Sequence, residues 1–195
     1  GGYGGIFLGF RVDHCNISGN NISLNWYGIW LNHCTENNII KNNTCNSNYN
    51  GIYLVDSCSN VITKNLCMNN SNAGVEFIYD SDNNTITENT FSSNRYGASF
   101  GSLHQTANNK FYLNNFINND QSIGGWWNPR PNIWNSTSKI TYTYNGKTYT
   151  NYLGNYWSDY TGSDADGDGI GDTPYSIDGD KDYYPLMEPW ENYSS

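Results

Sequence analysis

The sequence has few of the residues that build helical proteins, few basic residues and no long hydrophobic run. Alanine and leucine are scarce, whereas asparagine, a poor helix former, is abundant. The 9 lysines and arginines stand against 18 acids and form no basic patch. These shortages argue against a compact helical protein, a membrane span in this chain and a nucleic-acid partner.

What the chain has instead is aromatic and polar. Hydrophobic residues make up only 36% of the 195 residues, but aromatic residues reach 16%. That aromatic share, together with a regular apolar pattern, argues against disorder. The composition favours an all-β fold in which polar side chains stack in ladders.

The evidence for export is indirect. The five cysteines are an odd number and lack metal-type spacing. Seven N-x-S/T sequons are typical of an exported glycoprotein, at Asn16, Asn21, Asn42, Asn69, Asn83, Asn135 and Asn192. No signal peptide is present and the chain begins on a repeat without methionine, so we expect a mature form or a piece of a longer protein.

Five glycines mark a repeat of 23 residues: Gly5, Gly28, Gly51, Gly74 and Gly97. Four of them open a short apolar segment, for example Gly28-Ile29-Trp30-Leu31, and the segment after Gly97 is a weaker copy. A fixed period of this length indicates a solenoid. We interpret the glycines as corner residues that supply a turn conformation.

A second pattern, N-x-Φ-x-x-N-x-Φ-x-x-N with Φ apolar, fills the rest of each period. In the second copy Ile40 and Cys45 are the apolar positions, with Asn43 between them. Apolar residues five apart cannot share one helix face, but they fit two short strands joined by a bend. The repeat therefore predicts a right-handed parallel β-helix of about five rungs, whose asparagines stack in structural ladders.

The repeat ends near residue 120, which divides the chain into β-helix repeats (1–120) and a C-terminal capping region (121–195). Prolines indicate a loop at 126–131, and the segments 140–144 and 148–152 around Asn145-Gly146 predict a β-hairpin. This region is expected to cover the last rung. The first rung has no such cover, so either residues are missing upstream or another subunit stacks there.

These repeats resemble the parallel β-helix repeats of the carbohydrate-binding and sugar-hydrolase superfamily. More narrowly they resemble NosD-like surface proteins of methanogenic archaea, and the tail from Gly154 to Tyr160 is similar to the closing segment of those proteins. The resemblance implies the fold and a cell-surface location. It does not imply one activity, because the superfamily contains enzymes, binding modules and structural repeats.

The acidic segment 159–191, with ten acids against one base, predicts a cation site. Asp164, Asp166, Asp168 and Asp172 follow the oxygen-ligand spacing of a calcium loop, and the Ile170 carbonyl occupies position 7. Position 12 is not glutamate, so the missing ligand would come from another acid. Its candidates are Asp159, Asp178, Asp180 and Asp182. We expect a structural Ca²⁺; a solvated acidic turn is the alternative.

Three aromatic residues fall at the same outward position of successive repeats: Phe7, Trp30 and Tyr53. Glu76 and Ser99 continue this row. The three rings are predicted to form a flat, apolar surface for stacking on sugar rings. The alternative is that the C-terminal region or a neighbouring subunit covers them.

Catalysis and copper binding have weaker support. Glu76 and Asp80 are candidates for a glycosidase-type carboxylate pair, but their surroundings are ordinary polar residues. NosD relatives are linked to copper-enzyme maturation, which draws attention to His14-Cys15 and His33-Cys34. The two pairs sit at different offsets in their rungs and need not stack.

We therefore expect an extracellular or cell-surface β-helix module that is structural or adhesive, binds glycans or identical neighbours, contains calcium and is not an enzyme. The alternatives are a polysaccharide lyase or glycoside hydrolase, a fibre subunit that self-assembles through the first rung, and a metal-delivery protein. Cys45 and Cys67, at the same inward position of adjacent rungs, are either a disulfide or two buried thiols.

Overall fold

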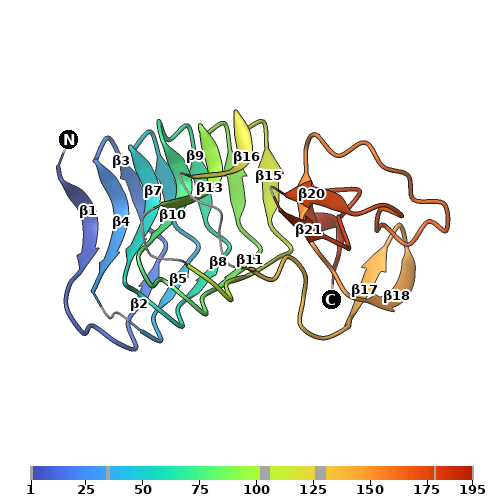
Figure 1. The fold of residues 1–195 in the computed structure, drawn as a ribbon, viewed down its shortest axis with the longest axis horizontal. Helices are drawn as coiled ribbons and strands as arrows, with labels where there is room; N and C mark the ends of the chain where they lie inside the picture. Colours follow the sequence, from blue (N-terminus) through green and yellow to red (C-terminus); the bar gives the residue numbers. More distant parts are fainter. Residues whose placement is uncertain (1, 34–35, 102–105, 126–130, 178, 195) are drawn as a thin grey trace.

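The computed structural model describes residues 2–33, 36–101, 106–125, 131–177 and 179–194. The strands stack side by side as rungs of a parallel β-helix, from β1 beside the N-terminus to β15 and β16 beside the cap (Figure 1). The predicted all-β fold class and repeat are confirmed. In the described ranges the helical structure is limited to the 3₁₀ turn η1 (Trp190–Asn192), and no helix there is long and apolar enough to cross a membrane.

Three parallel sheets run along the β-helix, and each is made of equivalent strands from successive rungs. Sheet A contains β1 (Gly4–Leu8), β4 (Tyr27–Asn32), β7 (Asn50–Val55), β10 (Ala73–Ile78), β13 (Tyr96–Gly101) and β16 (Gln121–Gly125). Sheet B contains β2 (Asn16–Ser18), β5 (Ile39–Lys41), β8 (Val61–Thr63), β11 (Thr85–Thr87) and β14 (Lys110–Tyr112). Sheet C contains β3 (Asn21–Ser23), β6 (Thr44–Asn46), β9 (Leu66–Met68), β12 (Thr90–Ser92), β15 (Asn115–Ile117) and β19 (Tyr156–Trp157).

The apolar Φ positions point inward and stack on one another. Ile17, Ile40, Ile62, Ile86 and Phe111 form one buried row, and Ile22, Cys45, Cys67, Phe91 and Phe116 form a second. Cys45 and Cys67 are both free thiols. The hydrogen bond with Cys45, and then burial, raises the pKa of the Cys67 thiol, so the pair behaves as part of the apolar core.

Buried asparagines form three ladders at the bends, as the repeat predicts. The second ladder contains Asn20, Asn43, Asn65, Asn89, Asn114 and Asn155. The Asn65 Oδ1 accepts the Asn43 N–H and side-chain amide, both at 3.0 Å, while its own Nδ2 donates to the Ile40 carbonyl at 2.8 Å. The Asn65 N–H and Nδ2 also donate to the Asn89 Oδ1 of the following rung, both at 2.9 Å, so Asn65 links the rungs on both sides of it.

Within the repeats, the left-handed backbone at the bends belongs to the residue before the ladder asparagine. Asn42, Lys64 and Glu88, for example, have φ of 54°, 55° and 57°. The ladder asparagines themselves do not have this conformation. They use their amides to bond neighbouring rungs, and a variable residue beside them makes the turn.

The prediction that the repeat glycines make the corners was wrong. Gly28, Gly51, Gly74 and Gly97 lie inside strands of sheet A and do not have positive φ. A Cβ at Gly74 would meet the Gly97 carbonyl oxygen at 2.7 Å and the Phe91 ring at 2.7 Å. Glycine is needed there because backbone and core side chains approach too closely for any side chain.

Residues beyond 120 continue the β-helix before they cap it. Strand β16 extends sheet A and β19 extends sheet C, while Ile133 bridges to Lys110 at the edge of sheet B. Trp134 stacks on Phe111 and Trp157 on Phe116, with ring centroids 4.7 and 4.4 Å apart. These two buried indoles close the end of the apolar core.

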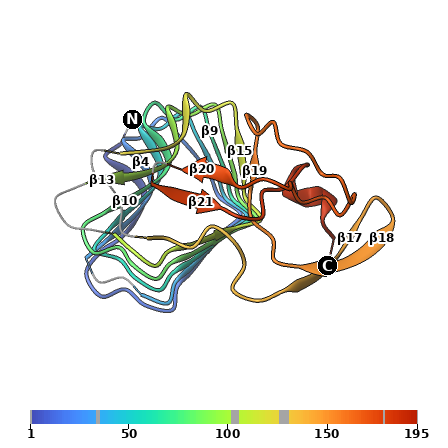
Figure 2. The ribbon, with the colours of Figure 1, turned by 45° about the vertical axis from the view of Figure 1, so that its right-hand side comes forward.

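The rest of the cap contains two antiparallel hairpins. The predicted one is β17 (Ile140–Tyr144) with β18 (Lys147–Asn151), joined by Asn145 and Gly146, both with positive φ. The second is β20 (Tyr175–Ile177) with β21 (Asp180–Asp182), which lies against the end of the β-helix, whereas β17–β18 projects away from it (Figure 2). Most of the predicted loop at 126–131, including Trp126, Trp127 and Pro129, lies outside the described residues.

A buried carboxylate, Asp182, terminates the second ladder. Its Oδ2 accepts the Asn155 N–H at 2.7 Å and the Trp157 Nε1–H at 3.0 Å, and its Oδ1 accepts the Tyr184 N–H at 3.0 Å. Burial raises the pKa of Asp182 to about 6, although these hydrogen bonds oppose the shift.

Replacing Asn65 with alanine is expected to cost about 3 kcal/mol of unfolding free energy. The change leaves the Asn43 N–H buried without a partner, which costs about 1–3 kcal/mol, and it also removes the Asn65 side-chain hydrogen bonds to the Ile40 carbonyl and the Asn89 Oδ1. Asn21→Ala, on the exposed face of β3, is the matched control and is expected to cost about 0.5 kcal/mol or less. Chemical denaturation of both variants measures the difference, and equal losses would contradict a stabilising ladder.

Asp182 is expected to make stability fall as pH rises from about 4 to about 6. Because its pKa is higher in the folded chain than in the unfolded one, the folded state binds the extra proton, so stability is greatest below pH 4 and is lost through pH 6. The full effect is about 3 kcal/mol. The unfolding free energy of wild type relative to Asp182→Asn, measured from pH 4 to 7, should fall by about this amount. A constant difference would contradict the assignment.

Candidate functional site

The predicted aromatic row lies on the outer surface of sheet A. Phe7, Trp30 and Tyr53 stand opposite one another on β1, β4 and β7. Glu76 and Ser99 continue the row on β10 and β13. The expected register is therefore confirmed; ligand binding by these residues remains a prediction.

Two tyrosines that the sequence interpretation missed join this row. Tyr27 stacks on Tyr53 with ring centroids 4.1 Å apart, and Tyr3 lies 5.9 Å from both Tyr27 and Trp30. Counting by twos back from Trp30 places Tyr27 on the inner side. The alternation breaks at Gly28, where a Cβ would point at buried Cys45 and Asn48, so Tyr27 returns to the outside. We call Tyr3, Phe7, Tyr27, Trp30 and Tyr53 the aromatic face.

The aromatic face is not the flat surface that we expected. Phe7 and Trp30 are tilted by 51°, and Trp30 and Tyr53 by 49°. The Trp30 Nε1 is buried and has no hydrogen-bond partner among the described residues, and burial raises the pKa of Tyr53. Phe7, by contrast, is 53% exposed. The rings lean on one another because each must pack against a neighbour only one strand away.

Glu76 lies beside this face but is not paired with Asp80. Its carboxylate accepts hydrogen bonds from the Asn50 and Asn72 amides and the Ser99 hydroxyl. Burial raises the pKa of Glu76, and these donors oppose the rise. Asp80 follows the end of β10 and lines a separate hollow of about 360 Å³ with His33, Asp56 and Tyr79. The two carboxylates thus have different surroundings.

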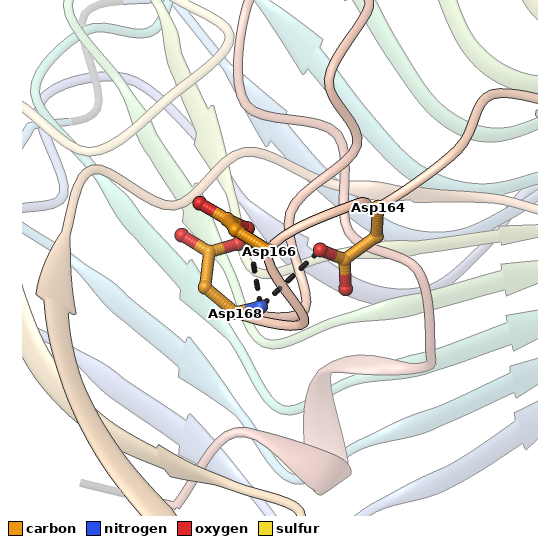
Figure 3. A group of neighbouring side chains, drawn as sticks. All are labelled: Asp164, Asp166 and Asp168. Carbon is orange, nitrogen blue, oxygen red and sulfur yellow. Dashed lines mark hydrogen bonds between the residues drawn. The ribbon is translucent and has the colours of Figure 1, made fainter.

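The acidic loop brings three of the five predicted calcium ligands together. Carboxylate oxygens of Asp164, Asp166 and Asp168 all lie within 4.8 Å of one another (Figure 3). Asp164 also accepts the N–H groups of Gly167 and Gly169, at 2.8 and 2.9 Å. Burial raises the pKa of Asp168.

Asp172, the fourth predicted carboxylate ligand, lies outside this group. Asp172 accepts the Ala165 N–H at 2.9 Å and the Ser163 hydroxyl at 3.1 Å, so it closes the loop. Ile170 is buried and bridges to Leu186. The ligand spacing in the sequence does not reveal these contacts. They give Asp172 and Ile170 structural partners within the cap.

The acids proposed to complete the site also have other partners. Asp159 accepts the Tyr175 hydroxyl, and Asp180 and Asp182 accept the indole N–H groups of Trp134 and Trp157. Asp178 lies outside the described residues. Asp180 and Asp182 therefore hold the tryptophans that close the core.

Tyrosines of the cap fix the backbone of the acidic loop. Tyr149 donates to the Gly167 carbonyl and Tyr142 to the Asp168 carbonyl, both at 2.8 Å, and Tyr193 donates to the Gly169 carbonyl. The hairpin β17–β18 thus supports the loop from one side.

The described histidines and cysteines do not form a copper site. Copper favours imidazole and sulfur ligands. The His33 Nδ1 lies 3.6 Å from an Asp56 carboxylate oxygen, and its ring stacks on Phe10. In the described ranges, the histidines, cysteines and acids converge as a group of three only at the hard oxygens of the acidic loop. Cys34 and His104 lie outside those ranges.

The fold and its surface define a β-solenoid protein with a cluster of aromatic rings on the outside of sheet A. Comparison with known proteins assigns its family: the family described as "Periplasmic copper-binding protein (NosD)" matches residues 1–162, so the chain belongs to the NosD family.

A curated relative from Pseudomonas aeruginosa, "Probable ABC transporter binding protein NosD", is 34% identical over 102 residues. The match covers 51% of this chain but only 19% of that relative, so the chain spans about a fifth of its length. No solved structure matches significantly.

Proposed function

We propose that this chain is an exported β-helix module that binds glycans at its aromatic face, has no catalytic role of its own and is stabilised by calcium in its cap. The observation that carries the proposal is the aromatic face itself. Five rings from three successive rungs gather on one side of sheet A, with Phe7 and Tyr3 largely exposed. Exposed aromatic clusters of this size are interaction sites rather than ordinary surface.

A glycan fits this face better than a charged partner does. The rings offer apolar surface to the CH groups of sugar rings, and the half-buried Glu76 carboxylate at its border offers hydrogen-bond acceptors. The periplasmic description of the family supports export. Most of the predicted sequons are also exposed, namely Asn16, Asn21, Asn42, Asn69, Asn83 and Asn192.

Glycan binding is tested by comparing variants on a panel of immobilised polysaccharides. Phe7→Ala is expected to weaken binding about tenfold, or about 1.4 kcal/mol, because it removes an exposed ring without opening the core. Tyr183→Ala, which removes a ring 59% exposed on the cap, is the matched control. Equal binding by both variants would contradict a role of the aromatic face, and release of shorter products would favour the lyase or hydrolase alternative.

Calcium would occupy the acidic loop. Asp164, Asp166 and Asp168 supply hard oxygen ligands on a backbone that three tyrosines already hold, and water completes the coordination. An ion there offsets the repulsion among three neighbouring carboxylates. Its role is structural, since it would tie the loop to the hairpin β17–β18.

Calcium is expected to stabilise the chain by about 2.7 kcal/mol at 100 times its Kd. Asp166→Asn should remove this gain, because it takes one carboxylate ligand from the site. Asp166 is the exposed member of the three, so the change should not disturb the core. Asp120→Asn, an exposed acid on the β-helix, should retain it. Thermal melts with and without calcium measure the gain, and an unchanged wild-type melting temperature would overturn the site.

A further inference from the structure

A cleft of about 720 Å³ runs along the corner between sheets C and A, separate from the hollow beside Asp80. The turns that join β3 to β4, β6 to β7 and β9 to β10 form its wall, so it spans successive rungs. Its volume lies in the range of small-ligand sites. None of the sequence motifs pointed to this corner.

Two stacked aromatic rings stand in the cleft. Trp26 and Tyr49 occupy equivalent places on successive rungs, and their ring centroids are 4.7 Å apart with 23° between the planes. They are 51% and 38% exposed, although their stacking already uses one face of each ring. The rings of Trp26 and Tyr49 lie nearly parallel, whereas the rings of Phe7, Trp30 and Tyr53 are tilted against one another.

The backbone that carries these rings is held firmly. Trp26 follows Asn25 and Tyr49 follows Asn48, and the Asn25 N–H donates to the Asn48 Oδ1 at 3.0 Å. Asn48 in turn donates its N–H to the Asn70 Oδ1 at 2.9 Å. The rings therefore project from backbone that ladder hydrogen bonds already hold, and a ligand would not have to order the corner on binding.

The polar lining of the cleft is uncharged. Asn25, Ser47, Asn69 and Ser71 contribute amides and hydroxyls, and none of the described residues that line it is acidic or basic. Ser71 follows Asn70 as Tyr49 follows Asn48, so the aromatic stack gives way to a hydroxyl on the next rung. Most of the chain's net charge of −9 belongs to the cap.

This chemistry selects a neutral sugar. An ionic ligand finds no opposite charge, and a wholly apolar ligand would desolvate amides and hydroxyls without replacing their hydrogen bonds. A pyranose ring satisfies both halves of the site, because its CH groups pack on an aromatic face and its hydroxyls bond to amides and serines. Tyr3 lines the cleft and also contacts Tyr27 and Trp30, so cleft and aromatic face are continuous.

We infer that the corner cleft is a subsite for an uncharged pyranose residue of a glycan that extends onto the aromatic face; the inference rests on the proposed function and adds to it the ligand's charge class and a second contact point. Trp26 and Tyr49 hold the sugar, and Ser47 and Ser71 orient it. The aromatic face carries the rest of the glycan through Tyr3 and Phe7.

Calorimetric titration of the whole chain with neutral hexasaccharides tests this subsite. The probes are the β-1,4-glucose, α-1,4-glucose, β-1,4-mannose and β-1,4-xylose oligomers, with an α-1,4-galacturonate hexamer as the acidic counterpart. At least one neutral oligomer should bind more tightly than the acidic one. Trp26→Ala and Tyr49→Ala should each weaken that binding about tenfold, and Trp26→Phe should restore most of it. Tyr183→Ala, an exposed ring on the cap, should bind as wild type.

The outcomes separate the subsite from the proposed function. If Phe7→Ala weakens binding but Trp26→Ala and Tyr49→Ala do not, the corner subsite is wrong and glycan binding at the aromatic face stands. Binding of the acidic oligomer alone overturns the neutral-sugar assignment. If every hexasaccharide and every polysaccharide of the panel fails to bind the wild type, both are overturned. Circular dichroism of the alanine variants, which remove exposed rings, verifies that the fold is retained.

Discussion

The structure depends on the hydrogen bonds that asparagines of one rung donate to the side-chain Oδ1 of the equivalent asparagine in the next rung. A parallel β-helix bends three times per turn, and at each bend backbone groups leave the sheets and need other partners. The asparagine ladders supply them, since each Oδ1 accepts two donors from one neighbouring rung and each Nδ2 reaches a carbonyl of the same or another rung. The chain can therefore form such bends with a small hydrophobic content, because its amides perform part of the work of a larger core.

Ending such a ladder is a separate problem, and the cap solves it with groups that differ from the repeat. Asn155 is the last amide of the second ladder, and buried Asp182 accepts its N–H where another asparagine would otherwise stand. Trp134 and Trp157 cover the last core phenylalanines, and Asp180 and Asp182 bond their indole N–H groups. A buried carboxylate is costly, and its raised pKa is the measure of that cost.

The same stacking displays residues outward at the spacing of the rungs. On sheet A this brings five aromatic rings together, and at the neighbouring corner it stacks Trp26 on Tyr49. The description of the family names copper, but the described part of this chain gathers no imidazole or sulfur ligands. Function in this segment, about a fifth of the length of the curated relative, is therefore best sought on its aromatic surface.

The sequence by itself determined the repeat, its inward rows, its ladders and the hairpin around Asn145-Gly146, because each of these follows from local spacing. Only the tertiary structure decided what depends on neighbouring rungs. It placed Gly74 inside a strand, where the Gly97 carbonyl and Phe91 leave no room for a side chain. It returned Tyr27 to the outer surface and assigned Asp172 to closing the acidic loop. The 23-residue period places Trp26 and Tyr49 at equivalent corners one strand spacing apart, but only the structure shows that both rings stand exposed beside a cleft.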